Sequence, residues 1–287
     1  MTITILDHAE PLLQRYRILF CDIWGVVHDG LTAYPGANDA LPRFRKAGGK
    51  VVLVSNAPRP GPSVARLLDE KSVSRDAWDA IVSSGDIALT HIAEVGYERL
   101  HRIGPYRRDS AFFDGLPGPD APIEEAEAIV CTGLNRDRQE QAEDYRPLLE
   151  RGLARRLPFV CANPDLAVHV GEDLLPCAGA IAALYEAMGG EVFWAGKPHR
   201  VAYETALKRA ADLTGGPVDR ANVLAIGDAV RTDIAAASGA GIDALLIAGG
   251  LHRDEVMSDG AIDRARLADL LAPPAPRPVA AMVHLVW

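Results

Sequence analysis

The 287-residue sequence is poor in cysteine and has no long hydrophobic run, and each absence excludes a class of protein. No apolar stretch reaches the about 18 residues that a membrane span needs, so we expect no membrane association. The four cysteines are widely separated and form no C-x-x-C pair. This spacing argues against a zinc site or a disulfide framework, and it predicts buried, reduced thiols at Cys21, Cys131, Cys161 and Cys177.

Positive charge is also scarce, because 30 Lys and Arg residues face 39 Asp and Glu residues for a net charge of −9. Proteins that bind nucleic acid usually concentrate positive charge, so we expect no nucleic-acid partner. The N-terminal sequence MTITILDHAEPLLQRY contains acids and does not resemble a secretory signal, which has a cationic segment followed by an apolar one. We therefore expect a cytoplasmic protein.

Short apolar runs alternate with longer amphipathic stretches along the chain. The hydrophobicity of these runs is continuous, as in strands that are covered on both faces of a parallel sheet. They comprise residues 18–24, 50–55, 80–84, 127–133, 158–163, 222–228 and 243–248. Several helix-like stretches between them end at glycine, as helices often do. The pattern predicts an α/β fold with a doubly wound, mostly parallel sheet, and the length favours a second domain.

Polar side chains stand at the ends of three predicted strands. They are Asp22, Ser55, Asn56 and Asp228, with Asp233 at the start of the next helix-like stretch. Each alone would be an ordinary cap or turn former, and Lys197 of the segment W-A-G-K-P-H would be a surface lysine. Ligands of doubly wound sheets bind at the carboxyl ends of strands. Acids gathered there can hold a hard cation, while a hydroxyl and an ammonium can bind a phosphoryl group.

Four motifs occur in a characteristic order: D-x-x-G-V at 22–26, S-N at 55–56, G-K-P at 196–198 and G-D-x-x-x-x-D at 227–233. This order resembles the haloacid dehalogenase (HAD) superfamily of aspartate-nucleophile phosphohydrolases. Residues 29–41, 81–89 and 162–186 look like its class IIA branch, which includes NagD-like nucleotide phosphatases, phosphoglycolate phosphatase and pyridoxal phosphatase. In that branch an α/β cap is inserted between the second and third motifs. The resemblance implies a HAD core at 1–86 and 179–287 and a cap at 87–178.

The resemblance also implies an activity, the Mg²⁺-dependent hydrolysis of a small phosphate monoester such as a sugar, nucleotide or vitamin B6 phosphate. Asp22 would attack phosphorus and form an aspartyl phosphate. Ser55 and Lys197 would assist by binding phosphoryl oxygens and neutralising charge. The metal ligands would be Asp22, the backbone carbonyl of Trp24, Asp228 and Asp233, and the substrate contacts would be Asn56, Arg59 and Asp165.

Trp24 departs from the pattern, because typical phosphatases of the superfamily carry an acid at this position. That acid protonates the leaving oxygen and then activates water, which is commonly worth about 10² to 10⁴ in rate. An indole can do neither. Another group, such as His28, Asp29 or Asp165, could supply the proton, or the leaving group could need little help.

Two further alternatives remain open. The related L-2-haloacid dehalogenases also carry an aromatic residue at the Trp24 position, but they work without a metal, which would leave Asp228 and Asp233 without a purpose. A catalytically weak or inactive chain could instead bind a phosphorylated metabolite without turning it over. The C-terminal segment LLAPPAPRPVAAMVHLVW ends in a strand-like run that would suit an edge strand of the core or a homodimer contact, and the sequence does not choose between them.

Overall fold

The computed structural model describes residues 3–170 and 173–287. The chain forms two compact units. The core unit comprises Met1–Ser55, Ala65–Val82 and Arg200–Trp287, and the second unit comprises Asn56–Val64 and Ser83–His199. The segment 87–178, which the resemblance implies as a cap, lies inside the second unit. Among the described residues, no helix is both long and apolar enough to cross a lipid bilayer.

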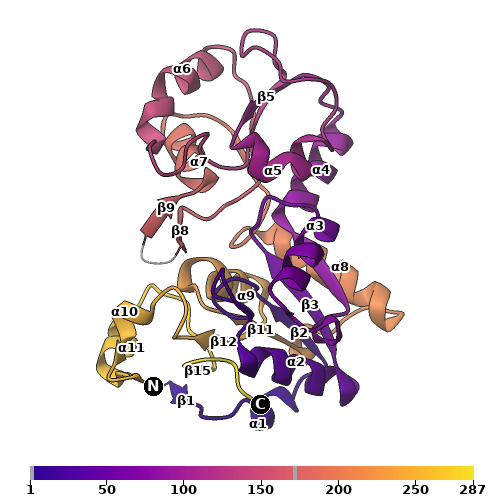
Figure 1. Cartoon of the computed structure of the whole chain (residues 1–287), viewed down its shortest axis with the longest axis vertical. Helices are drawn as coiled ribbons and strands as arrows, with labels where there is room; N and C mark the ends of the chain where they lie inside the picture. The colour runs from indigo at the N-terminus through magenta and orange to yellow at the C-terminus, as the bar shows by residue number, and fades with distance from the viewer. Residues whose placement is uncertain (1–2, 171–172) are drawn as a thin grey trace. The chain divides into compact units, whose positions relative to one another are not determined.

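A seven-stranded sheet organises the core unit (Figure 1). Its order is β1 (Thr4–Ile5), β15 (Ala280–Met282), β12 (Asp243–Ile247), β11 (Val223–Gly227), β2 (Ile18–Cys21), β3 (Lys50–Ser55) and β4 (Ala80–Ser83). Strand β2 pairs in parallel with both β3 and β11, and every residue of β2 and β11 is buried. Continuous apolar runs therefore became the central strands, and the predicted doubly wound α/β fold is confirmed.

The helices of the core unit follow the strands in the expected alternation. Helix α2 (Pro35–Lys46) starts with a proline, whose missing N–H needs no partner there, and it buries Ala37, Ala40, Leu41 and Phe44 at helical spacing. Both α2 and α8 (Arg200–Thr214) pack against β3. The remaining elements are α1 (Glu10–Leu13), α3 (Gly61–Glu70), η1 (Arg75–Ala77), η3 (Arg220–Asn222), η4 (Val230–Ile234), α9 (Ala235–Ala240), α10 (Arg253–Val256), β13 (Met257–Ser258), β14 (Ala261–Ile262) and α11 (Arg264–Leu270).

The C-terminal run does form a strand, but it is not at the edge of the sheet. Strand β15 pairs in parallel with β12 on one side and with β1 on the other. Strand β1 contains only two residues, Thr4 and Ile5, so no hydrophobic pattern of its own marks it in the sequence. It covers the edge that β15 would otherwise expose.

The second unit has its own parallel sheet, in the order β10 (Val192–Trp194), β7 (Phe159–Cys161), β6 (Ala128–Cys131) and β5 (Leu100–Ile103). Its apolar core includes the fully buried Phe159 and Tyr185. The other elements are α4 (Ser84–Val95), α5 (Tyr106–Phe113), η2 (Ala142–Tyr145), α6 (Arg146–Ala154), α7 (Ala178–Ala187) and the antiparallel hairpin of β8 (Ala167–Val170) and β9 (Asp173–Pro176).

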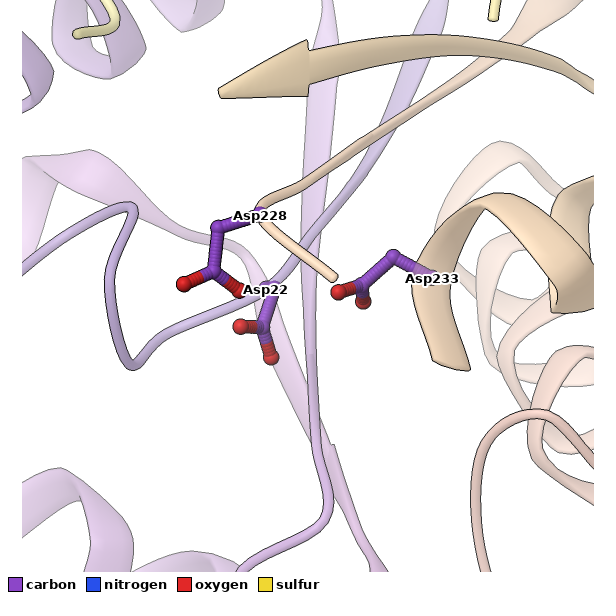
Figure 2. A group of neighbouring side chains, drawn as sticks. All are labelled: Asp22, Asp228 and Asp233. Carbon is purple, nitrogen blue, oxygen red and sulfur yellow. The ribbon is translucent and has the colours of Figure 1, made fainter. Parts of the chain in front are cut away.

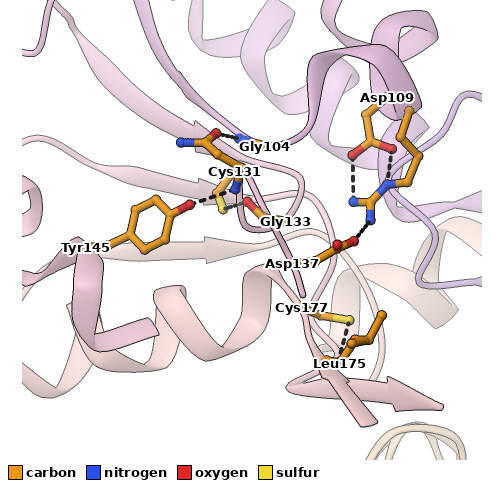
Figure 3. Close-up of polar contacts among 10 residues, drawn as sticks. Gly104, Asp109, Cys131, Gly133, Asp137, Tyr145, Leu175 and Cys177 are labelled. Atoms are coloured by element: carbon orange, nitrogen blue, oxygen red, sulfur yellow. Dashed lines mark hydrogen bonds and ion pairs between the residues drawn. The ribbon is translucent and has the colours of Figure 1, made fainter. Parts of the chain in front are cut away.

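The buried carboxylate of Asp109 in the second unit is paired (Figure 3). Asp109 is 1% exposed, and Arg108 donates two hydrogen bonds of 2.9 Å to its carboxylate and a third, of 2.8 Å, to Asp137. A buried charge needs such partners. All four cysteines of the chain are buried and free, as predicted, and burial raises the pKa of Cys177 to about 12, so this thiol is unreactive at neutral pH.

Candidate active site

Three aspartates meet at one edge of the core sheet (Figure 2). Asp22 follows β2, Asp228 follows β11, and Asp233 lies in η4. Because β2 and β11 are parallel neighbours, their carboxyl ends lie at the same edge. One carboxylate oxygen from each aspartate lies within 4.8 Å of the other two. Asp228 and Asp233 are 6% and 2% exposed, whereas Asp22 is only partly buried.

These three carboxylates repel one another. Two unit charges 4.8 Å apart repel by about 3 kcal/mol at an effective dielectric constant of about 20. A hard divalent cation offsets this repulsion, and oxygen ligands from carboxylates are those that Mg²⁺ and Ca²⁺ prefer. The chemistry and spacing of the three groups therefore fit a divalent cation.

The backbone around Asp228 leaves no room for side chains. The Leu251 N–H donates a 2.8 Å hydrogen bond to Asp228 Oδ2. A Cβ atom at Gly25 would lie 1.9 Å from the same oxygen, and one at Gly250 would lie 2.2 Å from it. Gly25 also has a φ of +79°, which glycine adopts without strain. The sequence shows these glycines beside strand ends, but their contact with Asp228 arises only in the fold.

The segment that follows β12 also braces the loop carrying Asp233. The Ala229 N–H donates to Asp233 Oδ2 at 3.2 Å, and the Val230 N–H donates to His252 Nε2 at 3.2 Å. The other ring nitrogen of His252 lies 2.9 Å from Glu255 Oε1, so it carries the proton and donates to that carboxylate. His252 was not among the predicted site residues, since nothing near it in sequence marks a partner 22 positions away.

The predicted phosphate-binding residues fall in both units. Ser55 ends β3 in the core unit and is 9% exposed. In the second unit, the Asn56 side chain donates to the Lys197 carbonyl at 3.0 Å and to Asp165 Oδ1 at 2.8 Å, and it accepts from the Lys197 N–H at 2.8 Å. The structure thus brings Asn56, Asp165 and Lys197 together. The Asn56 amide fixes the backbone at Lys197, a role that the sequence did not reveal.

Lys197 is only 2% exposed, which is uncommon for a lysine. Arg59 is partly exposed, and its backbone lies against Gly85, where a Cβ atom would come within 2.5 Å of it. The sequence places positive charge at Lys197 and Arg59, and the structure buries only Lys197.

Comparison with known proteins identifies the family. A family model described as haloacid dehalogenase-like hydrolase matches residues 19–110, and an HAD-hydrolase-like model matches residues 194–273. A 5'-nucleotidase of Bacillus subtilis is 31% identical over 257 residues, which cover 86% of this chain and 93% of that protein. The chain belongs to the haloacid dehalogenase-like hydrolase family.

Other members of the HAD family support this assignment. A crystal structure of a haloacid dehalogenase-like hydrolase from Brucella suis 1330 is 42% identical, covers 98% of this chain and 100% of that chain, and gives a TM-score of 0.85. A D-glycerol 3-phosphate phosphatase of Mycobacterium tuberculosis is 28% identical over 261 residues, or 85% of this chain. This alignment spans 66% of the Mycobacterium tuberculosis enzyme. A dihydroxyacetone phosphatase of Corynebacterium glutamicum is 34% identical over 97 residues, which cover 33% of that protein. The predicted family is confirmed, and the class IIA branch agrees with it.

Trp24 lies in the loop between β2 and α2 as a packed side chain. Its indole meets the His28 ring edge-on with centroids 5.2 Å apart. A Cβ atom at Gly30 would lie 2.6 Å from the indole, so the ring lies directly against the Gly30 backbone. The Gly25 N–H donates to the His28 carbonyl at 2.8 Å and closes the loop. The aromatic ring therefore helps to shape this loop.

His28 and Asp29, the two residues of this loop that were predicted as possible proton donors, form hydrogen bonds within the loop. His28 is 1% exposed, and its Nδ1 accepts a 2.9 Å hydrogen bond from the Gly30 N–H. Burial, reinforced by the Lys71 cation, lowers the pKa of His28 to about 4, so the ring is neutral at pH 7. Asp29 Oδ1 accepts from the Leu31 and Thr32 N–H groups, and the Thr32 bond in particular lowers the pKa of Asp29. Neither side chain holds an acidic proton to donate at neutral pH.

The buried, neutral His28 should make the metal-free protein sensitive to acid. An unfolded histidine binds a proton below its ordinary pKa of about 6.5, whereas folded His28 does so only near 4, so the unfolded state binds more protons between these values. The free energy of unfolding should therefore fall as the pH drops through this window, by on the order of 3 kcal/mol at pH 4 from this group.

Urea unfolding at pH 7 and pH 4.5 in EDTA measures this loss. Other groups titrate in the same range, so the comparison is with His28→Asn, whose side-chain oxygen can still accept from the Gly30 N–H. The variant should lose less stability than the wild type between the two pH values. An equal loss in both proteins would assign the acid sensitivity to other residues.

Proposed function

We propose that the protein is a Mg²⁺-dependent phosphohydrolase that acts on small phosphate monoesters through Asp22. The observation that carries this proposal is the group of three aspartates at the carboxyl edge of the core sheet, in which Asp22 is the most exposed. The buried and braced Asp228 and Asp233 are suited to hold a cation, while the more accessible Asp22 is suited to attack phosphorus. The named relatives, which are phosphatases or nucleotidases, support the same reaction class.

Asp22, Asp228, Asp233 and the Trp24 carbonyl would hold the cation. When bound, Mg²⁺ would neutralise the charge of the carboxylates and of the phosphate ester. Ser55 would donate a hydrogen bond to a phosphoryl oxygen, and the Lys197 ammonium would stabilise negative charge on the same group. We assign substrate contacts to Asn56, Arg59 and Asp165, and the choice of substrate to the segment 87–178 as a cap.

The substrate class follows from these groups. A phosphoryl dianion suits the buried cation of Lys197. Sugar-type phosphates and nucleotides are the first compounds to screen, because the relatives are named for such substrates. Vitamin B6 phosphates belong in the same screen.

Removal and return of the metal test the proposal. The protein should hydrolyse 4-nitrophenyl phosphate with Mg²⁺, lose at least about 100-fold of this rate in EDTA, and recover it when Mg²⁺ is added in excess. Asp233→Asn should raise the Mg²⁺ concentration needed for half-maximal rate by about 10-fold or more, because it removes one ligand charge. Asp254→Asn, a change at an exposed aspartate of α10, is the matched control and should not alter the requirement.

Trp24 supports a second candidate, a protein that binds a phosphorylated metabolite without hydrolysing it. Saturable binding of inorganic phosphate or a sugar phosphate together with no turnover of 4-nitrophenyl phosphate would favour that function. Release of chloride from 2-chloropropionate without metal would instead indicate a dehalogenase, a reaction in which Asp228 and Asp233 have no role.

A further inference from the structure

In the loop between β2 and α2, the residue two positions after Asp22 is Trp24, whose indole cannot accept a proton from water. His28 is 1% exposed with its Nδ1 occupied by the Gly30 N–H, and Asp29 Oδ1 accepts from the Leu31 and Thr32 N–H groups of its own turn. The only other ionisable residue of this loop is Tyr34. Its ring lies against His284 with centroids 5.1 Å apart, and burial raises the pKa of Tyr34, so its phenol stays protonated.

The lack of a proton-transferring group at the Trp24 position affects both steps of phosphoryl transfer. In phosphoryl transfer the attacking and leaving oxygens lie roughly opposite each other across phosphorus. When Asp22 attacks, the leaving oxygen departs on the far side. Water must later attack that same far side to displace Asp22. One position therefore serves to protonate the leaving group in the first step and to deprotonate water in the second.

A substrate can compensate for the missing group in the first step only. An acidic alcohol, such as a phenol or an enol, leaves as its anion and needs no proton. Water is the same nucleophile for every substrate, so the second step stays unassisted. General base assistance is worth about 10² to 10⁴ in rate, which is enough to reverse which step is slower.

We propose that an aspartyl phosphate on Asp22 accumulates during turnover of phosphate esters with acidic leaving groups. This inference rests on the proposed function. In the first step an Asp22 oxygen bonds to phosphorus, and the ester P–O bond breaks with its electron pair on the departing oxygen. In the second step a water oxygen bonds to phosphorus, the bond to Asp22 breaks and restores the carboxylate, and the protons of water pass to phosphate and solvent.

The proposal also narrows the substrate class. Among the small phosphate esters of the proposed function, those of acidic hydroxyl groups should react with Asp22 rapidly. Alkyl phosphates, including the sugar-type phosphates, have alkoxides that leave poorly and should react slowly. Across a series of aryl phosphates, the rate of the first step should fall as the phenol becomes less acidic. The rate of the second step should not change, because every substrate gives the same phosphoenzyme.

Rapid mixing of the protein with excess 4-nitrophenyl phosphate and Mg²⁺ tests the proposal. We expect a burst of about one 4-nitrophenolate per active site, at least about 10-fold faster than the steady rate, and acid-quenched protein that carries one phosphoryl group on Asp22. Trp24→Asp should remove the burst and raise the steady rate by about 10-fold or more. Trp24→Phe keeps an aromatic ring against Gly30 and should keep the burst.

Other outcomes would overturn the proposal. Steady hydrolysis by the wild type with neither a burst nor a phosphorylated Asp22 would show that a base elsewhere assists water. A burst that appears only in His28→Asn or in Asp165→Asn would identify that base. If the wild type instead releases no 4-nitrophenolate and takes up no phosphoryl group, the proposed function itself fails, a result distinct from hydrolysis without accumulation.

Discussion

Asp22→Asn should lower the turnover number for 4-nitrophenyl phosphate by at least about 10³-fold without unfolding the protein, because removal of a nucleophile commonly costs this much or more. The amide has the shape of the carboxylate but cannot attack phosphorus. It also removes one of three negative charges within 4.8 Å of one another, each pair of which repels by about 3 kcal/mol. In EDTA the variant should therefore be at least as stable as the wild type, and thermal unfolding measures this.

Asp29→Asn is the matched control, because Asp29 lies in the same loop and the amide oxygen can still accept from the Leu31 and Thr32 N–H groups. The rate of Asp29→Asn should stay within about threefold of the wild-type rate, because Asp29 has no part in the proposed metal site or in the attack on phosphorus. If Asp22→Asn kept more than a tenth of the wild-type rate, Asp22 would not be the nucleophile. A loss of stability in EDTA would show that the three carboxylates are not held in mutual repulsion.

Gly25→Ala should lower Mg²⁺-dependent hydrolysis by about 100-fold or more, because the new Cβ atom would lie 1.9 Å from Asp228 Oδ2. Either this carboxylate or the nucleophile loop must move, and displacement by about 1 Å is enough to disable a catalytic group. A second effect comes from the backbone, since alanine at a φ of +79° is strained by about 1 to 2 kcal/mol. Steady-state kinetics and a Mg²⁺ titration followed by thermal shift would separate rate from cation binding.

Gly48→Ala isolates the backbone strain. Gly48 has a φ of +96°, and a Cβ atom there would meet nothing within 4 Å. Both variants should lose stability through backbone strain, and Gly25→Ala should lose more because of its contact with Asp228, but only Gly25→Ala should lose activity and Mg²⁺ binding. Equal losses of activity in the two would mean that strain, and not contact with Asp228, explains the effect at Gly25.

Much of the fold and the three aspartates could be predicted from the sequence, because both depend on local patterns. Continuous apolar runs identify buried parallel strands, and β2 and β11 arose from such runs at 18–24 and 222–228. Parallel strands end at a common edge, so Asp22 and Asp228 follow directly as neighbours. The position of β15 inside the sheet could not be predicted from the sequence. Its outer partner β1 has only two residues, which are too few to show a hydrophobic pattern.

The sequence by itself determined the chemical groups of this site: an acid after each of two central strands, a third acid nearby, a lysine before a proline, and an indole at Trp24 where a second acid would be expected. The tertiary structure alone decided how the surrounding groups are used. It turned His28 inward onto Gly30, tied Asn56 to Lys197 across 141 positions, and placed Gly25 against Asp228. The reason is that burial and hydrogen bonding depend on segments far apart in the chain, and these set whether a side chain can carry a proton, fix a backbone or meet a substrate.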